Sequence, residues 1–245
     1  MIELKNLSRS FGKVKAVNNL NLTVSPGELF TFLGPNGAGK TTTVKMITGL
    51  ILPTEGEIYI KGIDILKKPE KAKSVIAYIP DEPFLYPELT GREFVFFVSR
   101  LYEMEKKTIE ERMERLLEEF GIGEWIDAPS SEYSHGMRQK VIFLQALIHN
   151  PDVMVIDEPM VGLDPVSART VKKLLRERVS AGASVFMSTH SLSLAEEISD
   201  RVGVIDNGVL LETGKVSELK KSMGATYSSL EEVYFKLTEE EKSVV

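Results

Sequence analysis

Cysteine is absent from the 245 residues, and this absence excludes both disulfide bonds and metal sites built on thiolates. A reducing, cytoplasmic setting is its simplest interpretation. Long apolar runs are missing too, and the run at Phe94–Val98, for example, ends at Ser99 and Arg100. A membrane-spanning helix needs roughly 18 to 20 consecutive apolar residues. The first residues, Met1–Lys5, lack the basic and then apolar order of a secretory signal. We therefore expect a chain that does not cross a bilayer by itself.

An excess of positive charge is also lacking. The 30 lysine and arginine residues are outnumbered by 36 aspartate and glutamate residues, giving a formal net charge of −6. This balance argues against a sequence-independent grip on nucleic acid, which relies on many basic contacts with phosphates. With 42% hydrophobic and 27% charged residues, the composition is that of an ordinary globular protein. The length allows one large domain or two small lobes.

Short apolar segments alternate with helical ones along most of the chain, which predicts an α/β fold with a mostly parallel sheet covered by helices. Five segments have the nearly continuous apolar character of buried parallel strands. They are Glu28–Leu33, Val75–Ile79, Val153–Asp157, Ser184–Ser188 and Val202–Asp206. The N-terminal segments Ile2–Leu7 and Ala16–Val24 instead predict an antiparallel β region with a turn at Phe11-Gly12-Lys13.

Between Thr90 and Asn150 the pattern becomes helical and indicates an inserted helical subdomain. Apolar residues recur there on one helical face, and Gly121 is the expected end of that helix. The residues of this face are Ile109, Met113, Leu116, Leu117 and Phe120. A last apolar stripe that begins at Leu230 predicts a C-terminal helix.

The stretch from Gly34 to Thr41 matches the phosphate-binding pattern G-x-x-x-x-G-K-[ST] and stands between an expected strand and an expected helix. Its glycines let backbone N–H groups converge on phosphate oxygens, and the positive end of the following helix adds to that field. Lys40 is expected to reach the β- and γ-phosphates of ATP, and the Thr41 hydroxyl to ligate Mg²⁺. The predicted nucleotide-binding residues are Gly34, Pro35, Asn36, Gly37, Ala38, Gly39, Lys40, Thr41 and Thr42.

A second motif consists of two acidic residues, Asp157 and Glu158, at the end of a predicted strand. Carboxylates at the C-terminal edge of a parallel sheet face the crevice in which such folds bind ligands. Asp157 fits the outer shell of the metal ion, through water, and Glu158 fits a general base that takes a proton from the attacking water. Alone, the pair could be a solvated strand end. Together with the phosphate loop, it predicts ATP hydrolysis.

The segment Tyr133-Ser134-His135-Gly136-Met137-Arg138-Gln139 lies shortly before the acidic pair and resembles the signature sequence of ATP-binding-cassette (ABC) proteins. The resemblance covers essentially the whole chain and implies a single ABC ATPase domain. Its parts would be a RecA-like P-loop NTPase core of about 1–89 and 151–215, a helical signature subdomain of about 90–150 and a C-terminal helical tail of about 216–245.

The resemblance also implies roles for residues outside the two nucleotide motifs. Phe11 would stack on adenine, Asp81 would take part in the metal site on the loop that links nucleotide to membrane subunit, and Gly162-Leu163-Asp164 would contact a second subunit. His190 would be the switch histidine, acting in catalysis with Lys40 and Glu158. Considered alone, Phe11 could be a packing aromatic and His190 a hydrogen-bonded residue at a strand end.

Two cassettes pack head to tail in this family, so the resemblance implies that Ser134 and Gly136 bind the ATP held by the other subunit of a dimer, which we expect to be a homodimer. A hydroxyl, a backbone N–H and a helix start would offer donors to the γ-phosphate. The sequence departs from the family pattern twice, with His135 where glycine is common and Asp81 where glutamine is usual. An aspartate can hold a hard cation, but its charge adds to that of the phosphates.

The resemblance is strongest to ATPase subunits of bacterial export systems of the multidrug and antibiotic efflux type. We therefore expect an ATPase that powers export through a separate integral-membrane subunit, on the inner face of the cell membrane. Phe84, Leu85 and Tyr86 are expected to line a groove for a helix of that subunit. The alternatives are a soluble ABC ATPase acting on ribosomes or nucleic acid, disfavoured by the net negative charge, and a small P-loop kinase, which leaves the signature segment unexplained.

Overall fold

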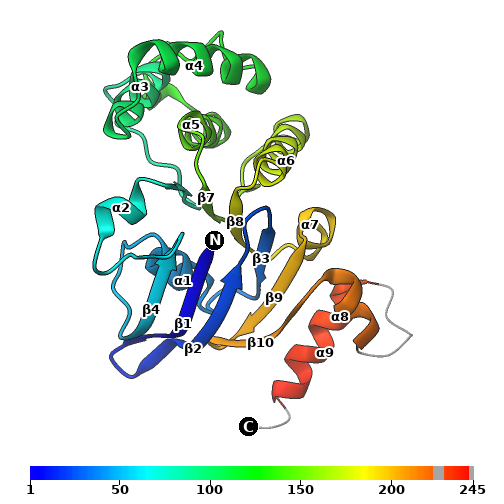
Figure 1. Ribbon diagram of the computed structural model, residues 1–245. Coiled ribbons are helices and arrows are strands. Elements are labelled where there is room, and N and C mark those ends of the chain that lie inside the picture. Colours follow the sequence, from blue (N-terminus) through cyan, green and yellow to red (C-terminus); the bar gives the residue numbers. More distant parts are fainter. Residues whose placement is uncertain (223–228, 243–245) are drawn as a thin grey trace.

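The computed structural model describes residues 1–222 and 229–242, so that 223–228 and 243–245 of the expected C-terminal tail lie outside the described residues. A six-stranded sheet forms the centre (Figure 1). In spatial order its strands are β10 (Val209–Gly214), β9 (Arg201–Asp206), β3 (Leu29–Leu33), β8 (Ser184–Thr189), β7 (Val153–Asp157) and β6 (Ile76–Ile79). Neighbouring strands are parallel except β10 and β9. The mostly parallel sheet and its five expected strands are confirmed.

A second, antiparallel sheet has four strands and includes the N-terminus. In spatial order they are β2 (Val14–Val24), β1 (Ile2–Phe11), β4 (Glu55–Ile60) and β5 (Ile63–Asp64). The turn begins one residue later than expected. Phe11 is the last residue of β1 and pairs with Val14, so that only Gly12 and Lys13 form the turn. The strands β4 and β5 were not predicted from the sequence.

Helices cover the parallel sheet, and α3 to α6 lie on the opposite side from the antiparallel strands (Figure 1). The helices are α1 (Lys40–Ile47), α2 (Pro69–Lys73), α3 (Gly91–Leu101), α4 (Lys106–Phe120), α5 (His135–Ile148), α6 (Pro165–Ser180), α7 (Leu192–Ile198), α8 (Val216–Ser222) and α9 (Leu230–Lys242), and a 3-10 turn spans Ser130–Glu132. No helix within the described ranges has both the length and the apolar character needed to span a membrane.

The alternation of side chains along the parallel strands divides the interior into layers. In β7, Met154 and Ile156 join the core beneath α3 to α6, whereas Val153 and Val155 join the core shared with α1 and the antiparallel sheet. A parallel strand buried on both faces needs apolar residues at every position, which explains the continuous apolar runs in the sequence. The sheet is thereby packed on both faces, and the loops at its C-terminal edge lead from buried strands.

Local sequence signals set the ends of the helices in the inserted segment. The Thr90 hydroxyl accepts a hydrogen bond from the Glu93 N–H at the start of α3, and the Glu93 carboxylate accepts one from the Thr90 N–H, which makes a capping box. Helix α4 ends at Gly121, whose φ of 61° is a left-handed conformation that glycine adopts without steric cost. The predicted apolar face from Ile109 to Phe120 is buried, so both the face and the end of this helix are confirmed.

Candidate functional site

The loop between β3 and α1 folds back on itself so closely that glycine is required at two positions. A Cβ atom on Gly34 would lie 2.3 Å from the Ile205 carbonyl oxygen, and one on Gly39 would lie 2.3 Å from that of Ala16. Gly39 also has a φ of 104° and immediately precedes α1. The loop therefore presents its backbone at the positive end of a helix, which is a suitable geometry for phosphate.

Lys40 extends from the first turn of α1 into the centre of this loop and is only 6% exposed. Its Nζ donates to the carbonyl oxygens of Gly34 and Pro35 at 2.7 and 3.1 Å and lies 3.8 Å from Glu158 Oε1. Burial lowers the pKa of the Lys40 amine, and the negative charges of Glu158, Asp157 and Asp81 oppose that effect. The structure thus brings together the phosphate-loop lysine and all three predicted carboxylates.

A cavity of about 180 Å³ opens between this loop and the strand ends. Its lining residues are Ala16, Asn36, Gly37, Gly39, Lys40, Thr41, Thr42, Asp81 and Glu158. Most of the predicted phosphate-loop residues and two of the predicted acids therefore face one space. Ala16 was not singled out from the sequence, because a small apolar residue in a strand carries no chemical signal.

Glu158 is held in position by polar contacts from the neighbouring strand. Its Oε2 accepts a hydrogen bond from the Thr189 hydroxyl at 3.0 Å, and its Oε1 lies 2.8 Å from Nδ1 of His190. Its backbone has a φ of 47°, in the left-handed region that non-glycine residues rarely adopt. His190 thus contacts the acid, and this contact fits both the expected switch role and a hydrogen-bonded histidine at a strand end.

Asp157 is 1% exposed and accepts a hydrogen bond from the Ser188 hydroxyl of the adjacent strand. The two residues are direct partners in the register of β7 and β8. Neither Ser188 nor Thr189, which donate hydrogen bonds to Asp157 and Glu158, was predicted from the sequence as a site residue. Their positions immediately before His190, on a strand expected beside β7, are the signal that could have identified them.

Asp81 faces the same cavity from the loop after β6. Burial raises the pKa of its carboxyl group, and the charges of Asp157, Glu158 and Glu82 raise it further, whereas His135 lowers it. A like-charged cluster disfavours ionisation in the absence of a cation. The expectation that the aspartate adds to the negative field of the site is consistent with this electrostatic environment.

The signature residues lie at the start of α5, outside the lining of the phosphate-loop cavity. Ser134 is the exposed N-cap of α5, and its hydroxyl accepts a hydrogen bond from the Met137 N–H at 3.2 Å. A Cβ atom on Gly136 would lie 2.6 Å from the Gly162 carbonyl oxygen, and one on Gly162 would lie 2.1 Å from the His135 ring. The signature segment therefore packs against the Gly162 loop of its own chain.

The aromatic residues expected at surface contacts are Phe11, Phe84 and Tyr86, and all three are exposed. Phe11 is 48% exposed at the end of β1, and the Arg9 guanidinium lies 4.5 Å from its ring centre. Phe84 and Leu85 line a hollow of about 220 Å³ with Arg138, but Tyr86 is not among its lining residues. Leu85 is only 5% exposed, because it packs into the core beneath α3 to α6.

A family model described as ABC transporter matches residues 17–161. The chain belongs to this family. EcsA, an ABC-type transporter ATP-binding protein of Bacillus subtilis, is 34% identical over 241 residues, which cover 98% of each chain. The SkfA peptide export ATP-binding protein SkfE of the same organism is 36% identical over 86% of this chain and 88% of its own. The bacitracin transport ATP-binding protein BcrA of Bacillus licheniformis is 33% identical over 100% of this chain and 78% of its own.

Solved structures agree with this assignment. An ATP-binding subunit of an ABC transporter superposes with a TM-score of 0.93 at 34% identity, covering 97% of this chain and 99% of that one. A dimeric ATP-binding cassette in a post-hydrolysis state, bound to ADP and Pi, superposes with a TM-score of 0.80 at 27% identity, covering 88% of this chain and 98% of that one. The chain is thus an ABC transporter ATPase subunit that binds and hydrolyses ATP. The kinase and ribosome alternatives are not favoured.

Proposed function

We propose that this ABC ATPase hydrolyses ATP at the cavity between its phosphate loop and the ends of β6 and β7. The observation that carries the proposal is the convergence of Lys40 and Glu158 on one space, with the two charged atoms 3.8 Å apart. Backbone N–H groups of 34–42 and the Lys40 ammonium would bind the phosphates, and the exposed Phe11 ring would stack on the adenine. Lys40 would exchange its bonds to the Gly34 and Pro35 carbonyls for phosphate oxygens.

Glu158 would act as the general base. Its contacts with Thr189 and His190 fix the carboxylate at the cavity wall, so that a water molecule between it and the γ-phosphate would lose its proton to Glu158. His190 would hold the carboxylate in this orientation and, by facing the γ-phosphate, would respond to its loss. Glu158 combines a left-handed backbone, of the strained kind that clusters at functional sites, with a carboxylate 3.8 Å from Lys40 Nζ.

Three of the described residues fit a Mg²⁺ site, namely Thr41, Asp157 and Asp81. The described chain has no cluster of three or more carboxylate or imidazole groups able to hold a metal by themselves. Such a sparse ligand set fits Mg²⁺, which keeps several waters and takes phosphate oxygens as ligands. The ion would neutralise charge on the β- and γ-phosphates. The raised pKa of Asp81 supports the fit, because a cation placed among these carboxylates would stabilise their ionised forms.

We propose that each ATP is bound between two copies of the chain packed head to tail. Ser134 and Gly136 do not line the phosphate-loop cavity of their own chain, yet Ser134 is exposed at the start of a helix, whose positive end can meet an anion. The solved cassette bound to ADP and Pi is dimeric, which supports the association of two copies. The expected helical subdomain of about 90–150 would carry the signature, and a bridge between Thr90 and Pro129 closes its 90–129 part.

Mixing two inactive variants tests the composite site. Lys40→Ala removes the phosphate-binding lysine, and Ser134→Arg blocks the signature with a large charged side chain. In a mixed dimer, one of the two sites combines an intact phosphate loop with an intact signature. We expect hydrolysis to return to a substantial fraction of the wild-type rate, which an ATPase assay on purified mixed dimers measures. A mixed dimer as inactive as its parents would contradict the head-to-tail arrangement.

We also propose an export role and a membrane partner for the chain. Relatives named for peptide export and bacitracin transport support an export role. Two copies of the chain would form a homodimer that binds a separate integral-membrane subunit on the inner face of the cell membrane. ATP hydrolysis by this homodimer would power export through that subunit. The exposed aromatic side chains of Phe84 and Tyr86, whose ring centres lie 5.6 Å apart, would be the anchor for that subunit.

A further inference from the structure

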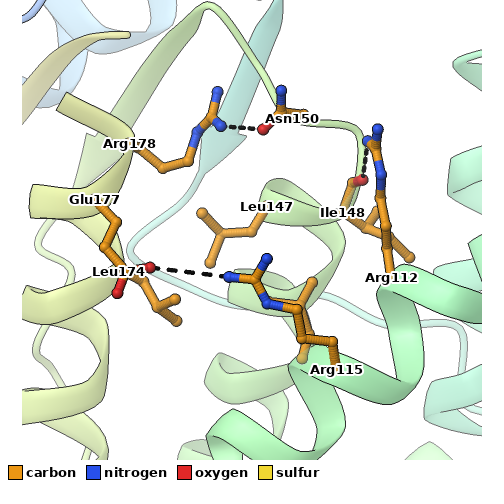
Figure 2. Close-up of a pocket in the computed structure, with 9 residues that line it drawn as sticks. Arg112, Arg115, Leu147, Ile148, Asn150, Leu174, Glu177 and Arg178 are labelled. Carbon is orange, nitrogen blue, oxygen red and sulfur yellow. Dashed lines mark hydrogen bonds and ion pairs between the residues drawn. The ribbon is translucent and has the colours of Figure 1, made fainter. Parts of the chain in front are cut away.

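A second cavity, of about 350 Å³, lies away from the nucleotide site, where α4, the end of α5 and α6 meet. Figure 2 shows its lining, in which three arginine side chains surround Leu147 and Leu174. Arg112 and Arg115 come from α4, and Arg178 comes from α6. The volume is within the range of small-molecule sites, although near its lower end.

Two of these arginines lack a carboxylate partner. Arg112 Nη1 donates to the Ile148 carbonyl at 2.9 Å, and Arg178 donates to the Pro151 carbonyl at 2.7 Å and to the Asn150 side chain (Figure 2). Within the described residues, neither guanidinium has an acidic group within ion-pair distance. Both positive charges are thus left uncompensated by local ion pairs, and neutral carbonyls satisfy only some of their donors.

Arg178 in particular has a donor left over. Its Nε is buried and has no hydrogen-bond partner among the described residues. Burial lowers the pKa of the Arg178 guanidinium, and although Asp152 raises it, the nearby charge of Arg112 lowers it again. Asp152 is itself 2.6 Å from Lys61. An anion placed between Arg112 and Arg178 would relieve their repulsion and supply an acceptor for the free donor.

Acidic groups do not fill the cavity. Glu177 lines it, but its carboxylate lies 3.6 Å from Lys173 and 3.9 Å from Arg115, so its charge is shared between two cations on the rim. Arg115 also bonds to Glu119 at 2.9 Å. The negative charge therefore stays at the Glu177 side, and the Arg112 and Arg178 side remains positive.

We propose that this cavity binds a compact organic anion, with its carboxylate or phosphate group between Arg112 and Arg178 and its apolar part on Leu147 and Leu174. Guanidinium groups suit oxyanions because their planar fork donates two parallel hydrogen bonds. The leucines are only 7% and 4% exposed, but together with the aliphatic stems of the arginines they give the cavity an apolar wall, which favours an apolar body over a bare ion. The ligand would contact α4 and α6 at once and so connect the helical insertion to the core.

Calorimetric titration with phenylphosphonate tests the proposal, with the protein saturated by Mg²⁺ and ADP so that the phosphate loop is occupied. We expect saturable binding to the wild type that is at least about tenfold tighter than binding of inorganic phosphate or benzyl alcohol, because each lacks one half of the ligand. Phenylacetate distinguishes a carboxylate from a phosphate source. Equal affinity for phenylphosphonate and inorganic phosphate, or no saturable binding of any of these probes, would overturn the proposal.

Variants locate the site. Arg112→Gln changes an exposed side chain and should weaken phenylphosphonate binding about tenfold, as should Arg178→Gln if circular dichroism shows that it folds. Lys107→Gln removes a positive charge from the same helix outside the cavity, and its affinity should equal that of the wild type. An unchanged affinity in Arg112→Gln would show that the anion binds elsewhere.

Discussion

At the scale of single residues, Glu158 is the group on which the proposed chemistry depends. Replacing it by glutamine preserves the shape of the side chain but removes the ability to take a proton, so we expect the hydrolysis rate to fall by about 10²- to 10⁴-fold while ATP still binds. Steady-state ATPase assays and nucleotide titration measure the two quantities. The matched control is Glu197→Gln, an exposed acid on α7 beside the same strand ends. Wild-type turnover in Glu158→Gln would exclude it as the base.

His149 is a residue whose protonation should affect stability and not catalysis. Its ring stacks on Tyr102 with centres 3.9 Å apart, and burial lowers its pKa from 6.5 to about 4. Between pH 6.5 and about pH 4, His149 binds a proton in the unfolded chain but not in the folded chain, so acid favours unfolding. The free energy of unfolding should be unaffected by this group above pH 6.5 and fall by at most about 3 kcal/mol as the pH drops toward 4.

The variant His149→Phe isolates this effect. Phenylalanine can still stack on Tyr102 but does not titrate, so its stability should depend less steeply on pH between 6.5 and 4 than that of the wild type. Urea unfolding at a series of pH values measures the difference. Parallel pH profiles for the two proteins would assign the acid sensitivity to other groups.

At the scale of elements, the capping box that starts α3 is a separable source of stability. Thr90→Ala removes the hydroxyl that accepts the Glu93 N–H, and we expect the free energy of unfolding to fall by about 1 kcal/mol. Thr108→Ala is the control, because this threonine lies inside the first turn of α4, where alanine has the higher helix propensity. Denaturant unfolding of both variants is the measurement, and equal stabilities would show that the cap contributes nothing.

At the scale of the whole molecule, the proposed membrane partner should bind through the exposed aromatics and not through Leu85. Phe84→Asp combined with Tyr86→Asp places charges at side chains that are 66% and 46% exposed. We expect ATP hydrolysis in solution to persist and co-purification with the membrane subunit to be lost. Leu52→Asp, at a 67% exposed position on another loop, is the control. Undiminished co-purification of the double variant would place the docking surface elsewhere.

The sequence alone determined the parts of this protein in which chemistry and spacing coincide. The phosphate loop is recognisable because its glycines, Lys40 and Thr41 are contiguous, and the parallel strands because burial on both faces demands continuous apolar residues. The strands β4 and β5 of the antiparallel sheet escaped prediction because part of their surface is solvated, so their apolar residues form no continuous run.

Tertiary structure alone decided which distant residues meet. The contacts of Glu158 with Thr189 and of Asp157 with Ser188 each join residues 31 positions apart, and they follow from the alignment of β7 with β8. The cavity of Arg112 and Arg178 depends on how α4 packs against α6. Leu85, expected at a docking groove, lines a surface hollow with Phe84 but is only 5% exposed, because it also packs into the core. The sequence does not predict whether a single loop side chain is buried, because its burial depends on the elements that pack around it.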